Sequence, residues 1–154
     1  MKRTFDLLQN ECGASLVELA LVLPLLLLLV LGAVDLGRAY YLSMEVAGAA
    51  HAAATYGSQN PTDTAGMKAV AQDDAPSITL SYPTLSYGCE CSDGTGYSVN
   101  CASAPSCAST TEVYRVDITV TGTYTTWFPW HWFGGLIPAS ITISNSASMR
   151  SAAS

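Results

Sequence analysis

The sequence predicts an α+β protein, in which a long N-terminal membrane helix extends outside the membrane and packs on a small antiparallel sheet with a disulfide-bonded loop. Three observations predict this fold. Residues 19–34 form an uncharged apolar run, two later segments alternate apolar with polar residues, and four of the five cysteines fall between residues 89 and 107. A chain of 154 residues has room for one compact domain beside the helix.

The membrane helix is predicted over residues 14–34. These 21 residues would span about 31 Å at about 1.5 Å each, which is the thickness of a bilayer's hydrocarbon core. A cleaved secretory signal is the alternative, but its apolar region is usually shorter and ends at a small-x-small site, which residues 35–38 do not offer. Lys2 and Arg3 precede the span and Arg38 follows it, so the positive-inside rule places the N-terminus in the cytoplasm.

Glu18 is the residue of this span that a plain anchor does not explain. A carboxylate at the centre of a membrane helix costs about 2.5 to 3.5 kcal/mol, and less near the interface. Two interpretations remain open. The side chain reaches the lipid headgroups, or it pairs with a cation that another chain or a new N-terminus supplies.

The residues around Glu18 carry a family resemblance. Residues 13–18, GASLVE, have the arrangement of a type IV prepilin processing site, with a glutamate fifth after the glycine. The wider stretch GASLVELALVLPLLLLLVLGAVDLGRAYY, followed by AGAAHAAATYG, resembles the TadE-like family of minor pseudopilins from tight-adherence (Flp) pilus systems. The matching positions are Gly13, Glu18, Leu23–Leu25, Asp35, Gly37, Arg38 and Ala52–Gly57.

This resemblance implies a structural role and a maturation step. Residues 1–13 would be a leader that a prepilin peptidase removes after Gly13, which leaves Ala14 as the new N-terminus. Glu18 would then meet the free amine of Ala14 on a neighbouring subunit and set the register of assembly. The implied partners are membrane lipid, the peptidase, and other pilins and pseudopilins, at the initiation or tip of a pilus.

Residues 35–154 form the expected extracytoplasmic domain, and they open with helices. Residues 35–57 continue the membrane helix, because Ala39, Leu42, Val46, Ala49, Ala53 and Tyr56 make one helical stripe. Gly57 is a natural stop for a helix. A short second helix is predicted to start at Asn60 as N-cap with Pro61 at its first position, and to end near Asp74.

Three strands are expected after these helices. Ile78–Tyr82 is a short candidate, whereas Glu112–Tyr124 alternates apolar and polar residues, with Val116, Ile118 and Val120 on the apolar side. Ser140–Arg150 repeats this period of two. Residues 112–150 therefore form a β-hairpin with a long connection. A sheet of three strands is marginal alone, so the helix should cover its apolar face.

The cysteine loop is predicted over residues 86–110. Its Gly, Ser, Asn and Pro residues bury little apolar surface, so cross-links would order it. Two pairings remain open, namely Cys89–Cys101 with Cys91–Cys107, or Cys89–Cys107 with Cys91–Cys101. A four-thiolate zinc site is the rival, but the spacings C-x-C and C-x5-C differ from the usual C-x2-C pairs. Cys12 would leave with the leader.

The connection of the hairpin is rich in aromatic residues. It holds all three tryptophans of the chain, and five large aromatic residues are candidates for a partner patch: Trp127, Phe128, Trp130, Trp132 and Phe133. These side chains either pack in the protein's own core, or form an exposed patch that docks a partner or touches a membrane interface.

Composition excludes several classes of function. The net charge of −6 argues against nucleic-acid binding. No catalytic constellation and no phosphate-binding loop stand out, since His51 and His131 lack companion residues. No enzyme activity, cofactor, metal or small-molecule substrate is therefore expected. Besides a pseudopilin in the cytoplasmic membrane or the pilus, the alternative is a membrane-tethered adhesion or binding domain that never joins a filament.

Overall fold

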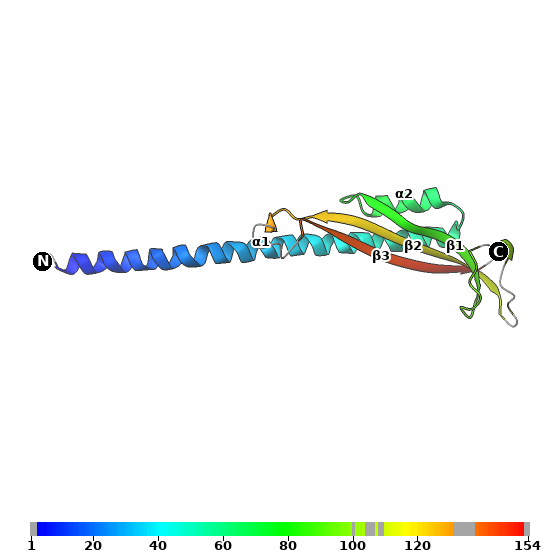
Figure 1. Ribbon diagram of the computed structural model, residues 1–154, viewed down its shortest axis with the longest axis horizontal. Coiled ribbons are helices and arrows are strands. Elements are labelled where there is room, and N and C mark those ends of the chain that lie inside the picture. Colours follow the sequence, from blue (N-terminus) through cyan, green and yellow to red (C-terminus); the bar gives the residue numbers. More distant parts are fainter. Residues whose placement is uncertain (1–2, 100, 104–106, 108–109, 131–137, 153–154) are drawn as a thin grey trace. The chain divides into compact units, whose positions relative to one another are not determined.

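The computed structural model describes residues 3–99, 101–103, 107, 110–130 and 138–152, with only the backbone described for residues 3–12, 83 and 152. The chain divides into an N-terminal unit, residues 1–38, and a C-terminal unit, residues 39–154. Helix α1 (Arg3–Gln59) belongs to both units and runs unbroken through Pro24 (Figure 1). Membrane helices tolerate such a proline better than soluble ones.

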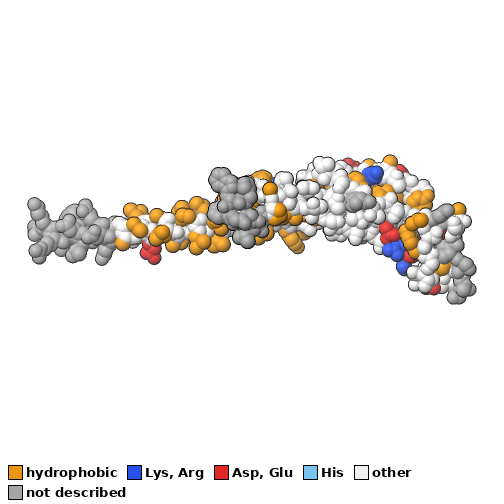
Figure 2. Space-filling view, viewed as in Figure 1, with side chains coloured by type: hydrophobic (Ala, Val, Ile, Leu, Met, Phe, Trp, Pro, Cys, Tyr) orange, Lys and Arg blue, Asp and Glu red, His pale blue; other side chains and the backbone are white. Residues whose placement is uncertain are grey.

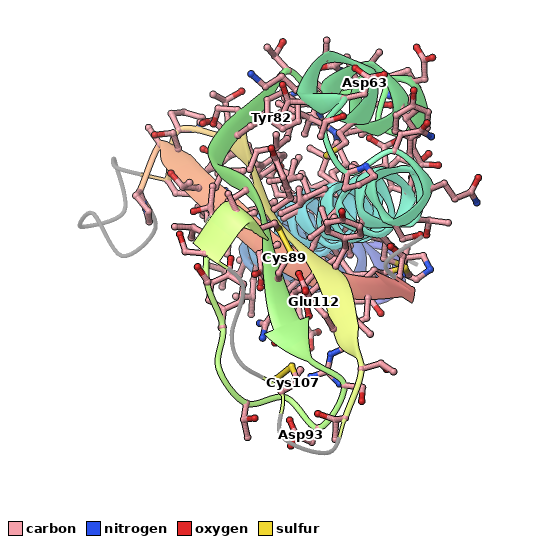
Figure 3. All side chains as sticks on the ribbon, turned by 90° about the vertical axis from the view of Figure 1, so that its right-hand side faces the viewer. Asp63, Tyr82, Cys89, Asp93, Cys107 and Glu112 are labelled. Atoms are coloured by element: carbon pink, nitrogen blue, oxygen red, sulfur yellow. A yellow bond between two sulfur atoms is a disulfide. The ribbon has the colours of Figure 1, made fainter. Side chains whose placement is uncertain are left out.

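The C-terminal unit combines two helices with one sheet. After the end of α1 come α2 (Thr64–Asp74), β1 (Leu80–Cys91), a short 3-10 turn η1 (Cys101–Ser103), β2 (Glu112–Thr125) and β3 (Ser140–Ala152). The strands form an antiparallel sheet in the order β1-β2-β3. Both helices lie on one side of this sheet (Figure 3). The predicted α+β fold, with its long helix and small antiparallel sheet, is confirmed.

Alanines let α1 approach the sheet closely. Ala49, Ala50, Ala53 and Ala54 are fully buried, and they pack with Val46 of the same helix against residues of α2 and β2. The inward positions of β2 are Val116, Ile118 and Val120, as the alternation predicts. Met67 of α2 is the largest fully buried side chain and joins the two layers.

Glycines mark where these layers touch. A Cβ on Gly57 of α1 would lie 2.9 Å from both Met67 and Val116. A Cβ on Gly122 of β2 would collide with Ile78 and stand 3.2 Å from Val46. Both positions therefore need the smallest side chain because a neighbouring element passes over them.

The second helix begins later than its sequence predicts. Asn60 is not its N-cap, because the amide of Asn60 donates to the carbonyl of Tyr56 and so closes the end of α1. Asp63 caps α2 instead, and its Oδ1 accepts from the amide of Gly66 at 2.9 Å. The hydroxyl of Tyr56 donates to Oδ2 of the same carboxylate at 2.7 Å. This tertiary contact from α1 favours Asp63 over Asn60.

The first strand is longer than the predicted Ile78–Tyr82. It runs Leu80–Cys91 and pairs with β2 along its length, apart from an irregularity between Ser81 and Thr84. Pro83 falls in this irregularity, where the missing amide of a proline is tolerated. Cys89 and Cys91 therefore stand in a strand, and the cysteine-rich loop begins after Cys91 rather than at residue 86.

Candidate assembly site

The N-terminal unit exposes most of its large apolar side chains. Large side chains from Leu16 to Leu36 are exposed along α1 (Figure 2). One helix of the described chain, within Gly13–Gln59, is long and apolar enough to cross a membrane. Exposed leucines in this number need an apolar environment, so this N-terminal helix suggests a single-pass membrane protein.

Gly13, Ala14 and Glu18 lie on this helix, and all three are exposed. A Cβ on Gly13 would meet no atom within 4 Å, so the fold of this chain imposes no glycine there. Glu18 is the sole charged residue among residues 13–34, and it follows Ala14 by four positions, which is about one helical turn. The helix thus displays one carboxylate on an apolar surface, directly after the predicted processing site.

The cysteines form two disulfides at one end of the C-terminal unit. Cys89 bonds to Cys101 and Cys91 bonds to Cys107, which is one of the two predicted pairings. Figure 3 shows Cys107 and Asp93 on the side of the unit away from Asp63 of α2. The four thiols are consumed in these bonds, so the zinc alternative is wrong.

A buried glutamate, Glu90, lies between Cys89 and Cys91 on β1. The side chain of Glu90 is fully buried and makes ion pairs with Nη1 of Arg115 at 3.2 Å and with Nε of Arg150. Arg115 and Arg150 are directly opposite each other on β2 and β3, a placement that would be repulsive without an anion between them. Glu90 therefore balances two like charges, which ties all three strands together.

Further groups complete this charge cluster. Nε of Arg115 donates to Asp117 at 2.9 Å, and the ring of Tyr97 lies 5.4 Å from the Arg115 guanidinium. Hydrogen bonds to the carboxylates of Asp117 and then Glu90 raise the pKa of the Arg115 side chain. Two cations and two carboxylates neutralise each other here, so the cluster is a structural brace of this end.

Sequence reasoning missed this cluster. The alternation of β2 does place Arg115 and Asp117 on the face away from the helices, and that was the available signal. The partner of Arg115 depends on the register of β1 and β3, which the sequence pattern does not define. Glu90 lies between two cysteines in a segment that was predicted as loop.

The aromatic segment begins directly after β2. The amide of Thr126 donates to the carbonyl of Ala139 at 3.1 Å and closes the hairpin, so Trp127, Phe128 and Trp130 lie beyond the end of the sheet. Trp127 is 73% exposed, while Phe128 and Trp130 are half-buried with ring centroids 4.9 Å apart, edge to face. Trp132 and Phe133 lie outside the described residues.

Other predicted positions are spread along the chain. Asp35 is buried and Arg38 is half-buried on α1, and His51 is exposed. Across the part of the chain that the structure describes, no group of three or more His, Cys, Asp or Glu side chains could hold a metal ion. The predicted positions therefore lie along α1 and do not gather into a metal-binding site among the described residues.

Comparison with known proteins bears on the helix. Residues 13–55 match the family model of TadE-like proteins, and the match begins at Gly13. No curated protein and no solved structure matches the chain. The matched residues include Glu18, the apolar span and the alanines that α1 buries against the sheet. Over residues 13–55, less than a third of its length, the chain is therefore similar to TadE-like proteins.

Proposed function

We propose that this chain is a minor pseudopilin that a prepilin peptidase matures after Gly13, and that it acts in the initiation or at the tip of a tight-adherence pilus. The observation that carries the proposal is the position of Glu18. It is the one charged residue among residues 13–34, a largely exposed apolar segment whose family match starts at Gly13.

The physical role of Glu18 is to set the register between subunits. An unpaired carboxylate in lipid is costly. The amine that cleavage would create on Ala14 of a neighbouring subunit relieves this cost only where the two helices meet at the correct height. Elsewhere along residues 19–34 the helix offers no charge and would slide against its neighbour without preference.

The disulfides support an orientation. Disulfides form and persist in oxidising compartments, and the C-terminal unit holds two of them. With Lys2 and Arg3 on the cytoplasmic side, the proposed topology has a cytoplasmic N-terminus, a span over residues 14–34 in the inner membrane, and residues 35–154 outside the cytoplasm. Its partners are then membrane lipid, the peptidase and other pilins.

The test replaces Glu18 with alanine in the full chain and measures recovery in sheared pili and in complexes with other pseudopilins. Membrane insertion and both disulfides should stay intact. Recovery should fall at least about tenfold, since a loss of only about 1.4 kcal/mol changes an equilibrium by that factor. Glu11→Ala is the matched control, because this carboxylate would leave with the leader. Normal recovery of Glu18→Ala would contradict the proposed role.

A membrane-tethered binding domain is the second candidate, and the exposure of Trp127 favours it. Such a protein needs no cleavage and no intersubunit ion pair. It would keep Met1, tolerate Glu18→Ala, and lose binding of a partner when Trp127 is replaced by serine.

A further inference from the structure

The two ends of the C-terminal unit are defined by the direction of α1 against β2. Val46 of α1 lies against Gly122, and Gly57 lies against Val116. Residue numbers rise along the helix while they fall along the strand, so α1 and β2 are antiparallel. The end of β2 at Thr125 is consequently at the helix-start end, the end of the unit that holds Ala39, its first residue on α1. Figure 1 shows β2 running opposite to α1.

Aromatic side chains from two segments gather at this helix-start end. From Val46 back to Tyr40 the helix rises about 9 Å, and from Gly122 to Thr125 the strand advances about 10 Å, so both reach the same level. Tyr40 and Tyr41 are 69% and 55% exposed, and Trp127 is 73% exposed. The cysteine loop lies at the opposite end, because Cys91 pairs with Glu112 at the start of β2.

The strands contribute no charge to this helix-start end over a long stretch of sequence. Residues 118–149 contain no Asp, Glu, Lys or Arg, and they include all of the connection between β2 and β3. The opposite end holds the cluster of Glu90, Arg115 and Arg150 together with Asp93 and Glu112. On the helix side, Glu45 is a charged residue beside Tyr41, and its carboxylate accepts a hydrogen bond from the Tyr41 hydroxyl. Tryptophan and tyrosine are enriched at the membrane–water interface, so a surface with aromatic rings and few charges suits it.

The helix-start end is tethered close to the apolar span. Residues 35–38 alone separate Val34, the last residue of that span, from Ala39, the first of the C-terminal unit. Even a fully extended chain would cover no more than about 18 Å over that interval. Tyr40, Tyr41 and Met44 are exposed and follow the apolar span closely in sequence, which favours lipid over a protein partner as the occupant.

We propose that Trp127, Tyr40 and Tyr41 form an aromatic anchor that lies in the headgroup region of the bilayer and holds the C-terminal unit end-on at the membrane surface. The proposal depends on the span crossing a bilayer and does not depend on assembly into a pilus. Tryptophan and tyrosine favour this interface because their rings are apolar and their N–H or O–H groups remain hydrated.

The test uses the full chain in phosphatidylcholine–phosphatidylglycerol vesicles and the fluorescence of Trp127 alone. The variant W130F/W132F leaves Trp127 as the only tryptophan. Phosphatidylcholine brominated in the upper acyl chain should quench at least about half of its emission, because interfacial side chains lie about 5 to 10 Å into the headgroup and acyl boundary. Aqueous acrylamide should quench it weakly in vesicles.

The matched control places the probe at the opposite end. Val99 is 70% exposed, so W127F/W130F/W132F/V99W carries a single tryptophan in the cysteine loop. The two ends of β2 are about 40 Å apart at about 3.3 Å per residue. Brominated lipid should therefore leave the emission of this control variant unchanged, while acrylamide quenches it. Intact disulfides, measured by the absence of free thiols, show that each variant is folded.

Three results would overturn the proposal. Strong acrylamide quenching of Trp127 in vesicles would show that this side chain faces water. If that quenching disappears only after other pilus subunits are added, a protein partner covers Trp127 instead of lipid. Resistance of Trp127 to both quenchers would show burial within the chain. Equal bromine quenching at positions 127 and 99 would show a unit that lies flat on the membrane.

Discussion

Leucines in one stretch of α1 and alanines in the next have opposite environments. Between Leu16 and Leu36 most of the large side chains are exposed, whereas the small side chains from Ala49 to Ala54 that face the sheet are fully buried. Both segments are apolar and helical, so hydropathy alone does not separate them. Side-chain size separates them. A helix packs closely on a sheet only where its side chains are small, whereas lipid accommodates long branched side chains.

The largest expected loss of stability comes from a substitution in the core of the C-terminal unit, and it tests whether that core excludes the membrane span. Met67→Ala should lower the free energy of unfolding by about 2 to 5 kcal/mol, because it leaves a cavity between α1 and the sheet. Urea unfolding of the full chain in detergent micelles measures this change. Leu26→Ala, a truncation of an exposed side chain in the span, should leave the unfolding of the C-terminal unit unchanged. Equal losses would contradict the division into two environments.

Removal of one disulfide should have the next largest effect. In Cys91→Ser/Cys107→Ser the loop closed over 16 residues is released, and stability should fall by about 2 to 4 kcal/mol. The comparison of melting temperatures with Cys12→Ser provides the control, since Cys12 lies before the predicted cleavage site and outside the C-terminal unit. A stability equal to that of the parent chain would mean that the brace around Glu90 orders this end without the cross-link.

Substitutions that enlarge alanines sharpen the comparison of size. Ala53→Leu inserts three carbon atoms into a fully buried position and should destabilise the unit by about 1 to 3 kcal/mol. Ala33→Leu makes the same change at an exposed position of the span and should have no effect on unfolding by urea. A tolerated Ala53→Leu would show that α1 can move away from the sheet at little cost.

The smallest expected effect concerns the cap of α2 and its pH dependence. The amide of Gly66 and then the hydroxyl of Tyr56 hold the pKa of Asp63 below its ordinary value. This contribution to stability is present above the unfolded pKa of about 3.9, and it is lost as the pH falls through the lower folded pKa. Helical circular dichroism of Asp63→Asn should lose this acid sensitivity, whereas Asp73→Asn, an exposed acid at the end of α2, should keep it.

Much of the fold could be predicted because its signals are local. The alternation in β2, the alanine stripe of α1 and the clustering of cysteines each occupy a short stretch of sequence. The predictions were wrong where a segment distant in sequence determines the boundary of an element. Asp63 caps α2 with help from Tyr56 of α1, and β1 extends to Cys91 because β2 continues to pair with it. The Glu90 cluster needed the register of three strands.

The candidate site shows the same division. Gly13, Ala14 and Glu18 could be proposed from the sequence because the predicted processing motif depends only on spacing along one helix. The placement of Trp127 at the helix-start end of the C-terminal unit could not be predicted, because it follows from the antiparallel course of α1 and β2.

The most direct test of the account is the N-terminus of the mature protein, measured by mass spectrometry on chain recovered from membranes. The account predicts that the native chain begins at Ala14. Gly13→Leu should retain the leader, and Gly37→Leu should still begin at Ala14, since a Cβ at either glycine meets no atom within 4 Å and neither change disturbs the helix. A native polypeptide that keeps residues 1–13 would contradict the account, because Ala14 would then carry no amine for Glu18 to meet.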